Sequence, residues 1–208
     1  MDEILCFGDS NTWGYSPELG RRFPRDIRWT GVLQRTLGNG YHVIEEGQCG
    51  RTTAWDDPVE GGTRNGRAYL APCLESHAPL DLVILMLGTN DTKKRFSLTA
   101  NDIGQCTAGL VDLVKSSTSG HDGTAPRLIL VAPPPLTSLT AFADMFEDGT
   151  AKSEKLGGIY RDIAAGRGSA FLDAGDIIST SPLDGVHFEE AEHGKLGREL
   201  ARMVKQIQ

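Results

Sequence analysis

A serine near the start of the chain could act as a nucleophile. Ser10 lies in the run Gly8-Asp-Ser-Asn11, directly after an apolar segment. A serine hydroxyl is nearly inert at neutral pH, so it attacks a carbonyl only when a base lies within hydrogen-bond reach. An isolated Gly-Asp-Ser tripeptide is more often a polar turn and helix cap. A chemical role for Ser10 therefore depends on partners elsewhere in the sequence.

One histidine has the surroundings of such a base. His187 follows Asp184 by three residues across Gly185, a spacing that lets the carboxylate fold back onto the ring and hold its tautomer. The pattern is weak on its own, because it also arises as a turn around a hydrogen-bonded histidine. Three other histidines are expected in a strand, in a polar loop and on a solvated helix turn, respectively: His42, His121 and His193.

Two further residues could hold the charge that such a reaction creates. Attack on an ester carbonyl puts negative charge on its oxygen, and preorganised N–H groups aimed at that oxygen can be worth ~2.7–4 kcal/mol each. Gly50 can offer a backbone N–H with no side chain in the way. Asn90, in Gly88-Thr-Asn-Asp91, can offer an uncharged side-chain amide. A turn that caps the next helix is the competing interpretation of Asn90 and Asp91.

Five short apolar runs predict the strands that would position these residues. The runs are nearly continuous in apolar character, as expected for parallel strands covered on both faces, and span residues 4–7, 41–45, 82–87, 128–132 and 170–172. Helical periodicity marks residues 29–37, 103–114 and 196–207, with Thr99 and Asp102 placed as a capping pair. Residues 137–149 are expected to form a short helix or a mobile loop.

The alternation of strands and helices predicts a doubly wound α/β sandwich, in which ligands bind beyond the carboxyl ends of the strands. Ser10, Gly50 and Asn90 follow the first, second and third predicted strands. Asp184 and His187 follow the fifth predicted strand. All five residues should therefore gather at one edge of the sheet.

The same residues occur in the order of the four sequence blocks of a known superfamily. Ser10 in Gly-Asp-Ser-Asn, Gly50, Asn90 in Gly-Thr-Asn-Asp, and Asp184 with His187 in Asp-Gly-Val-His resemble the SGNH (GDSL-type) hydrolases. The sequence is most similar to the arylesterase/acyltransferase (perhydrolase) branch, and the supporting stretches are residues 4–10, 29–33, 45–47, 50–53, 80–93, 133–136 and 171–174. Asn11 departs from the pattern, since leucine is more usual there.

This resemblance implies a fold and an assembly. The fold would be a flavodoxin-like, three-layer α/β sandwich with a five-stranded, mainly parallel sheet, formed by a single SGNH hydrolase domain over residues 1–208. No cofactor and no metal is implied. Members of this branch commonly assemble with the pocket walled partly by neighbouring subunits, so a homo-oligomer is expected.

The resemblance also implies a reaction. Ser10 would attack a short-chain aryl or alkyl ester, His187 would take and return the proton, and Asp184 would orient His187. The oxyanion would be held by the N–H groups of Ser10 and Gly50 and by the Asn90 side chain. Water would release the acid from the acyl-enzyme, or an alcohol or peroxide would accept the acyl group.

Apolar residues beside these motifs are candidates for a substrate channel. In related enzymes such positions line a narrow channel for the acyl and leaving groups, so we expect substrate contacts from Trp13, Phe142, Met145 and Val186. Core packing or a subunit contact is the competing interpretation, and it is favoured for Phe146 and Phe188.

Other functions stay open at this point. A carbohydrate or xenobiotic deacetylase would use the same chemistry, because the pocket loops decide the substrate. A non-catalytic binding module is opposed by the complete set of motifs. A metallophosphoesterase, prompted by Asp9, Asn90, Asp91 and His187, lacks the bridging carboxylate and extra histidines that it requires. No G-x-S-x-G, G-x-G-x-x-G, Walker or H-E-x-x-H pattern is present.

The composition of the chain argues against several classes of binding partner. The 21 basic and 28 acidic residues give a net charge of −7, which argues against nucleic acid or anionic lipid as a partner. The longest apolar run, residues 82–87, is far shorter than the ~20 residues that span a bilayer. The acidic N-terminus does not suit a signal peptide, and the four cysteines form no Cys-x-x-Cys pair. We therefore expect a cytoplasmic protein with reduced thiols that acts on a small-molecule ester.

Overall fold

The computed structural model describes residues 1–207, and its centre is one five-stranded sheet. The strands lie in the order β2-β1-β3-β4-β5, and all four pairings are parallel. Their bounds are Asp2–Gly8 (β1), Tyr41–Gly47 (β2), Leu82–Met86 (β3), Arg127–Ala132 (β4) and Ala170–Asp173 (β5). The expected flavodoxin-like sheet is thereby confirmed, and each predicted strand matches an observed one to within two residues at either end.

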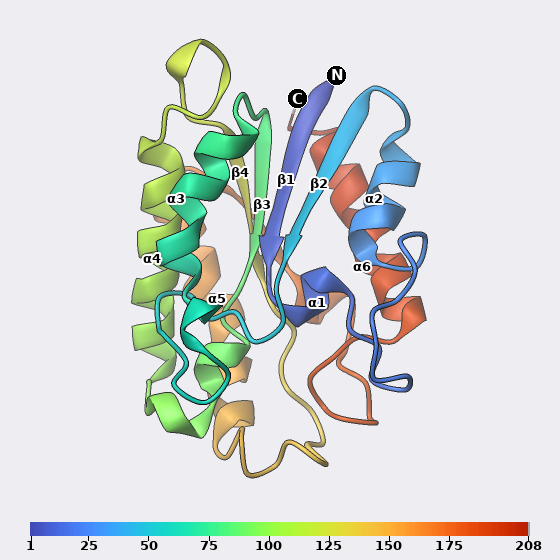
Figure 1. The fold of residues 1–208 in the computed structure, drawn as a ribbon, viewed down its shortest axis with the longest axis vertical. Helices are drawn as coiled ribbons and strands as arrows, with labels where there is room; N and C mark the ends of the chain where they lie inside the picture. The colour runs from blue at the N-terminus through green and yellow to red at the C-terminus, as the bar shows by residue number, and fades with distance from the viewer. Residues whose placement is uncertain (208) are drawn as a thin grey trace.

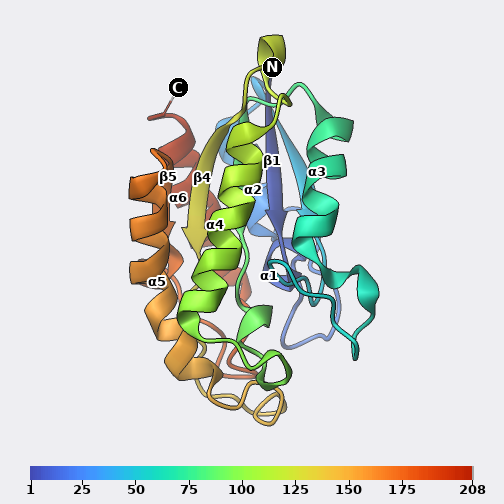
Figure 2. The same ribbon diagram turned by 90° about the vertical axis from the view of Figure 1, so that its left-hand side faces the viewer.

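Helices cover both faces of the sheet (Figures 1 and 2). Three of them, α3 (Gly66–His77), α4 (Ala100–Ser116) and α5 (Gly149–Gly166), lie on one face. The other face carries α2 (Trp29–Leu37) and α6 (Glu190–Val204), which pack against each other. A four-residue helix, α1 (Ser10–Trp13), lies at the carboxyl end of β1. The three-layer α/β sandwich is therefore confirmed.

Successive side chains of β1 point to opposite faces and so join two separate hydrophobic cores. Leu5 and Phe7 pack among the apolar side chains of α3, α4 and α5. Ile4 and Cys6 pack with α2 and α6. This burial on both faces explains why the sequence of β1 is continuously apolar instead of alternating.

Two expectations about helices gain detail from the structure. Thr99 and Asp102 form the predicted capping box at the start of α4, in which each side chain accepts a hydrogen bond from the other residue's backbone N–H. The loop 137–148 is rich in turns and contains no α-helix, and α5 begins directly after it at Gly149. None of the helices within residues 1–207 is both long and apolar enough to cross a membrane.

The predicted position of His193 on a solvated turn is wrong. Its side chain is completely buried between α2 and α6, where Nδ1 accepts a hydrogen bond from the Trp29 backbone at 3.2 Å. The rings of Phe23 and Phe188 lie edge-on to the imidazole. Burial lowers the pKa of His193 to about 3, so the ring is neutral at physiological pH.

All four cysteines are free thiols, as expected.

Candidate active site

The predicted nucleophile lies at the switch point of the sheet, where chain connections leave in opposite directions from the adjacent strands β1 and β3. Gly8 ends β1, and Asp9 caps α1 by accepting a hydrogen bond from the Asn11 backbone at 2.9 Å. Ser10 is the first residue of α1, with 6% of its surface exposed. Its hydroxyl therefore lies at the edge of the sheet where ligands bind in such folds.

The structure brings His187 and Asp184 to this serine. His187 Nε2 lies 3.0 Å from Ser10 Oγ, and His187 Nδ1 lies 2.7 Å from Asp184 Oδ2. All three residues are at least nine-tenths buried. A histidine held in this way can accept the serine proton through Nε2 while the carboxylate stabilises the positive ring.

A tight turn holds this acid–base pair in place. Asp184 Oδ1 accepts hydrogen bonds from the backbone N–H groups of Val186 and His187 at 2.8 and 2.9 Å. Gly185 has φ of +74°, and a Cβ there would lie 2.8 Å from the Ser138 backbone. Burial would raise the pKa of Asp184, but the hydrogen bonds from His187 and Val186 outweigh it and lower that pKa. Asp184 is therefore ionised at neutral pH, as an orienting carboxylate must be.

Three N–H donors are available where an oxyanion would form. The backbone N–H groups of Ser10 and Gly50 donate to no other group within residues 1–207. Gly50 has φ of +77°, which favours glycine, and a Cβ there would lie 2.2 Å from Glu60. Asn90 Nδ2 donates to the Arg51 carbonyl at 3.1 Å and reaches Asp9 only at 3.5 Å, so it can turn one hydrogen toward a ligand.

Two buried carboxyl groups, those of Asp9 and Asp91, belong to the residues next to Ser10 and Asn90 in the chain. Burial raises the pKa of Asp9 to about 6, partly opposed by its hydrogen bond from Asn11. Burial also raises the pKa of Asp91 to about 6, although Asp91 accepts hydrogen bonds from the backbone and hydroxyl of Thr53. These contacts fasten the turn after β3 to the segment that follows Gly50.

A small cavity of about 180 Å³ opens onto Ser10 and His187. Its lining includes Gly50 and Asn90, and it has an apolar wall formed by Phe142, Met145, Phe146 and Val186. Three of the four expected substrate contacts are therefore brought to the cavity. Phe146, for which core packing or a subunit contact was favoured, is buried but also lines the cavity.

Trp13 is not among the residues that line this cavity. The Arg22 guanidinium lies over its ring, 5.2 Å from the centroid, and also donates to the Trp13 carbonyl.

Several lining residues were not identified from the sequence: Tyr15, Cys49, Glu60 and Lys93. Lys93 is 2% exposed, and its Nζ lies 2.6 Å from Glu60 and 3.7 Å from Asp57. Lys93 lies within a stretch that carries the family resemblance, which is the one signal available in the sequence. Its pairing with Glu60 depends on the fold of the loop before α3.

The unusual Asn11 forms a link between the two halves of the site. Its Nδ2 donates to the Val186 carbonyl at 3.2 Å, next to the Ser10–His187 contact. Its Oδ1 is buried and has no hydrogen-bond partner within residues 1–207. Leucine could not make this link between α1 and the histidine turn.

One group of potential metal ligands lies elsewhere in the described chain. Donor atoms of Glu46, Cys73 and His77 lie within 4.8 Å of one another, beside the end of β2 and on α3. Two of them are in hydrogen-bond contact, since His77 Nε2 lies 2.9 Å from Glu46 Oε1. None of the three lines the cavity at Ser10.

Comparison with known proteins gives a consistent result. The GDSL-like Lipase/Acylhydrolase family matches residues 6–194 of the chain. No curated protein matches the sequence.

Several solved structures are similar over their full length. A carbohydrate acetylesterase from Sinorhizobium meliloti has 42% identity and a TM-score of 0.96, with 100% of both chains covered. An inhibitor-bound aryl esterase from M. smegmatis has 45% identity and a TM-score of 0.95, again with 100% of both chains covered. A lipase/acylhydrolase from Enterococcus faecalis, with 19% identity, a TM-score of 0.71 and coverage of 100% of this chain and 97% of that one, shares the fold.

Proposed function

Because the chain belongs to the GDSL-like Lipase/Acylhydrolase family, we propose that it is a serine esterase of short-chain acyl esters that uses Ser10, His187 and Asp184. The observation that carries the proposal is the 3.0 Å contact between Ser10 Oγ and His187 Nε2 at the floor of a small cavity. The nucleophile Ser10 contacts the base His187, and His187 contacts the orienting acid Asp184, as ester hydrolysis through an acyl-enzyme requires.

The reaction proceeds in two halves. Ser10 Oγ attacks the ester carbonyl carbon while His187 Nε2 takes the hydroxyl proton, and the carbonyl oxygen becomes an oxyanion held by Ser10 N–H, Gly50 N–H and Asn90 Nδ2. The intermediate collapses, the bond to the alcohol breaks, and His187 returns the proton to the leaving oxygen. A water molecule then attacks the acyl-enzyme in the same way, which releases the acid and restores the Ser10 hydroxyl.

The size of the cavity supports a small acyl group. About 180 Å³ is below the ~300–1,000 Å³ typical of drug-sized ligand sites. Bulky side chains, chiefly Phe142 and Phe146, contribute much of the wall. We therefore expect acetyl esters to be hydrolysed faster than esters of long fatty acids.

Two further activities have specific support. A carbohydrate deacetylase is favoured by the Glu60–Lys93 pair, because two charged groups in the cavity could bind sugar hydroxyls. Acyl transfer to an alcohol is favoured by the apolar wall, which would admit an alcohol at the expense of water. The name of one full-length relative, a carbohydrate acetylesterase, agrees with the first of these two activities.

The test compares Ser10→Ala with Ser116→Ala, an exposed serine on α4, on p-nitrophenyl acetate, butyrate and octanoate without added metal. We expect Ser10→Ala to lower kcat by ~10⁴–10⁶ and Ser116→Ala to leave it unchanged. Retained activity in Ser10→Ala would move the nucleophile elsewhere, and wild-type protein without any activity would favour a binding module. Sugar acetates, assayed with and without an alcohol acceptor, then separate deacetylation from acyl transfer.

A further inference from the structure

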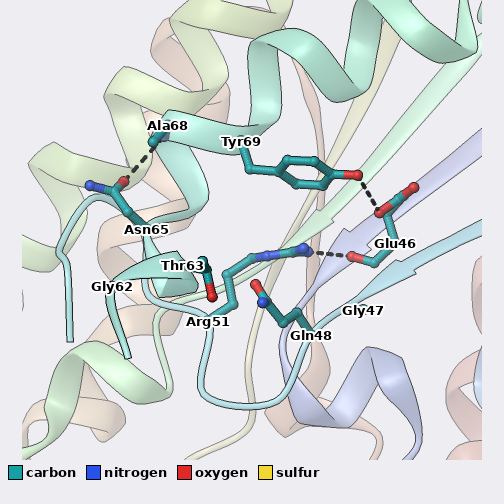
Figure 3. A pocket seen from close by; sticks show the side chains of 9 residues that line it. All are labelled: Glu46, Gly47, Gln48, Arg51, Gly62, Thr63, Asn65, Ala68 and Tyr69. Carbon is teal, nitrogen blue, oxygen red and sulfur yellow. Dashed lines mark hydrogen bonds between the residues drawn. The ribbon is translucent and has the colours of Figure 1, made fainter. Parts of the chain in front are cut away.

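A second, larger cavity lies outside the catalytic one. Its volume is about 530 Å³, and it is bounded by the end of β2, the segment 47–51, the turn 62–65 and the first turn of α3 (Figure 3). It shares no lining residue with the cavity at Ser10. The reaction proposed above uses none of its side chains.

Arg51 forms the base of this cavity and is almost completely buried, with 3% of its surface exposed. Its Nη1 donates to the backbone carbonyls of Gly8, at 2.9 Å, and of Glu46. The guanidinium carbon lies 4.2 Å from the ring centroid of Phe7 and 5.3 Å from that of Tyr69. These contacts fix the plane of the guanidinium group.

Three of the five N–H groups of this guanidinium have no acceptor in the part of the chain that the structure describes. Within residues 1–207, Nε and Nη2 of Arg51 donate to no protein group. Burial lowers the pKa of Arg51, which reflects the loss of water around the cation. Neither atom is completely buried, so both can donate a hydrogen bond to a ligand in the cavity.

The unused donors define the chemistry of that ligand. Nε and Nη2 form one edge of the guanidinium, and two parallel N–H bonds from this edge match the two oxygens of a carboxylate. Glu46 does not fill this position, because its Oε1 contacts His77 at 2.9 Å. Its Oε2 accepts a hydrogen bond from the Tyr69 hydroxyl at 3.3 Å, as Figure 3 shows.

The rest of the cavity suits the body of a small organic acid. Tyr69 is 41% exposed and presents an aromatic surface beside Arg51. The hydroxyl of Thr63 lies on the opposite turn and can donate to a further oxygen. The volume is sufficient for a molecule of monosaccharide size.

We propose that this cavity binds a small organic carboxylate, with both of its oxygens accepting hydrogen bonds from Nε and Nη2 of Arg51. The guanidinium also donates to the carbonyl of Gly8, two residues before Ser10, so Arg51 itself is a poor choice for substitution. Ala68, an exposed residue on the first turn of α3 that also lines the cavity, allows a cleaner test.

The test measures binding of glucuronate and of glucose by calorimetry to the wild type, Ala68→Trp and Ala68→Ser. We expect saturable binding of glucuronate that weakens with added salt, and none of glucose, because glucose lacks the carboxylate. The indole in Ala68→Trp should occupy the cavity and weaken glucuronate binding by ~tenfold or more, whereas Ala68→Ser should bind as the wild type does.

NMR spectroscopy can observe the Arg51 side chain directly. Its Nε–H resonance in a ¹H–¹⁵N spectrum should shift on addition of glucuronate and stay unchanged with glucose. Three outcomes would overturn the proposal: no glucuronate binding, equal binding of glucose, or undiminished binding in a folded Ala68→Trp protein. The last outcome would place the acid in another site, such as the catalytic cavity.

Discussion

At the scale of single residues, a substitution of Asp184 tests how His187 is oriented while the nucleophile Ser10 stays unchanged. In Asp184→Asn, Oδ1 can still accept from the backbone of Val186 and His187, but the amide NH₂ would face His187 Nδ1. That contact forces the proton onto Nε2, so the ring can no longer take the proton of Ser10. We expect kcat to fall by ~10⁴ with little change in KM.

Steady-state kinetics on p-nitrophenyl acetate would measure this effect, with Asp176→Asn, an exposed carboxylate in a surface turn, as the matched control. Comparable activity in both variants would show that the carboxylate of residue 184 does not set the tautomer.

The residues of the site differ in how far they could be predicted from the sequence. Five residues were identified because each follows a strand and belongs to a short motif: Ser10, Gly50, Asn90, Asp184 and His187. The structure places four of them around one cavity and Asp184 in a hydrogen bond with His187. The position of His193 was predicted wrongly, since its acidic neighbours in sequence suggested solvent. Its burial comes from the packing of α6 on α2, which local sequence does not show.

At the scale of elements, the contact between α2 and α6 depends on one glycine. A Cβ at Gly197 would lie 2.6 Å from the Trp29 carbonyl oxygen and 2.7 Å from Val32 Cβ, so the helices would have to separate. Gly194, one turn earlier on the same helix, would place a Cβ 3.2 Å from the flexible end of Arg198. The two glycines therefore have opposite effects when replaced by alanine.

We expect Gly197→Ala to lower the free energy of unfolding by ~1–3 kcal/mol through overpacking. Gly194→Ala should raise it by ~0.5–1 kcal/mol, because alanine favours the helix. Urea denaturation followed by circular dichroism would measure both, and a stable Gly197→Ala protein would mean that the two helices can move apart at little cost.

Strands were easier to predict than helices. The five apolar runs were sufficient because parallel strands are buried on both faces. Helix α3 was missed, since it buries only Gly66, Leu70, Cys73 and Leu74 and contains Pro72, which leaves no regular apolar period. The loop 137–148, which supplies Phe142 and Met145 to the cavity, has no periodic pattern from which its path could be inferred.

At the scale of the whole molecule, His193 should make the fold sensitive to acid. Its pKa is about 3 in the folded protein and ~6.5 when unfolded, so the unfolded chain binds a proton first as the pH falls. The stability that the neutral ring contributes is complete above pH ~6.5 and is lost by ~1.4 kcal/mol per pH unit below it. The raised pKa values of Asp9 and Asp91 act in the opposite direction over the pH range from about 4 to 6.

A variant isolates the histidine from these carboxyls. In His193→Asn the side-chain oxygen can still accept from Trp29, but the group no longer titrates. The free energy of unfolding should fall less steeply than in the wild type between pH 6.5 and 4.5. Equal slopes in the two proteins would show that the buried ring takes up its proton without unfolding.

The expected homo-oligomer also belongs to this scale. Large apolar side chains are exposed on loops of the described chain, including Leu19, Trp55, Val59 and Leu183. A second copy could cover them, as the family resemblance implies. Sedimentation analysis should therefore give a mass that is a multiple of 22.5 kDa, and a single species at 22.5 kDa would remove the expectation.

Ser10 and its partner His187 are separated by 177 positions along the chain. A growing polypeptide would carry an inert hydroxyl until the imidazole, 177 positions later, had also been synthesised and folded against it. Fragments released early, or cut before residue 184, would have no hydrolytic power with which to damage cellular esters. Every turnover would thus report a molecule in which the segments that carry Ser10 and His187 had already met.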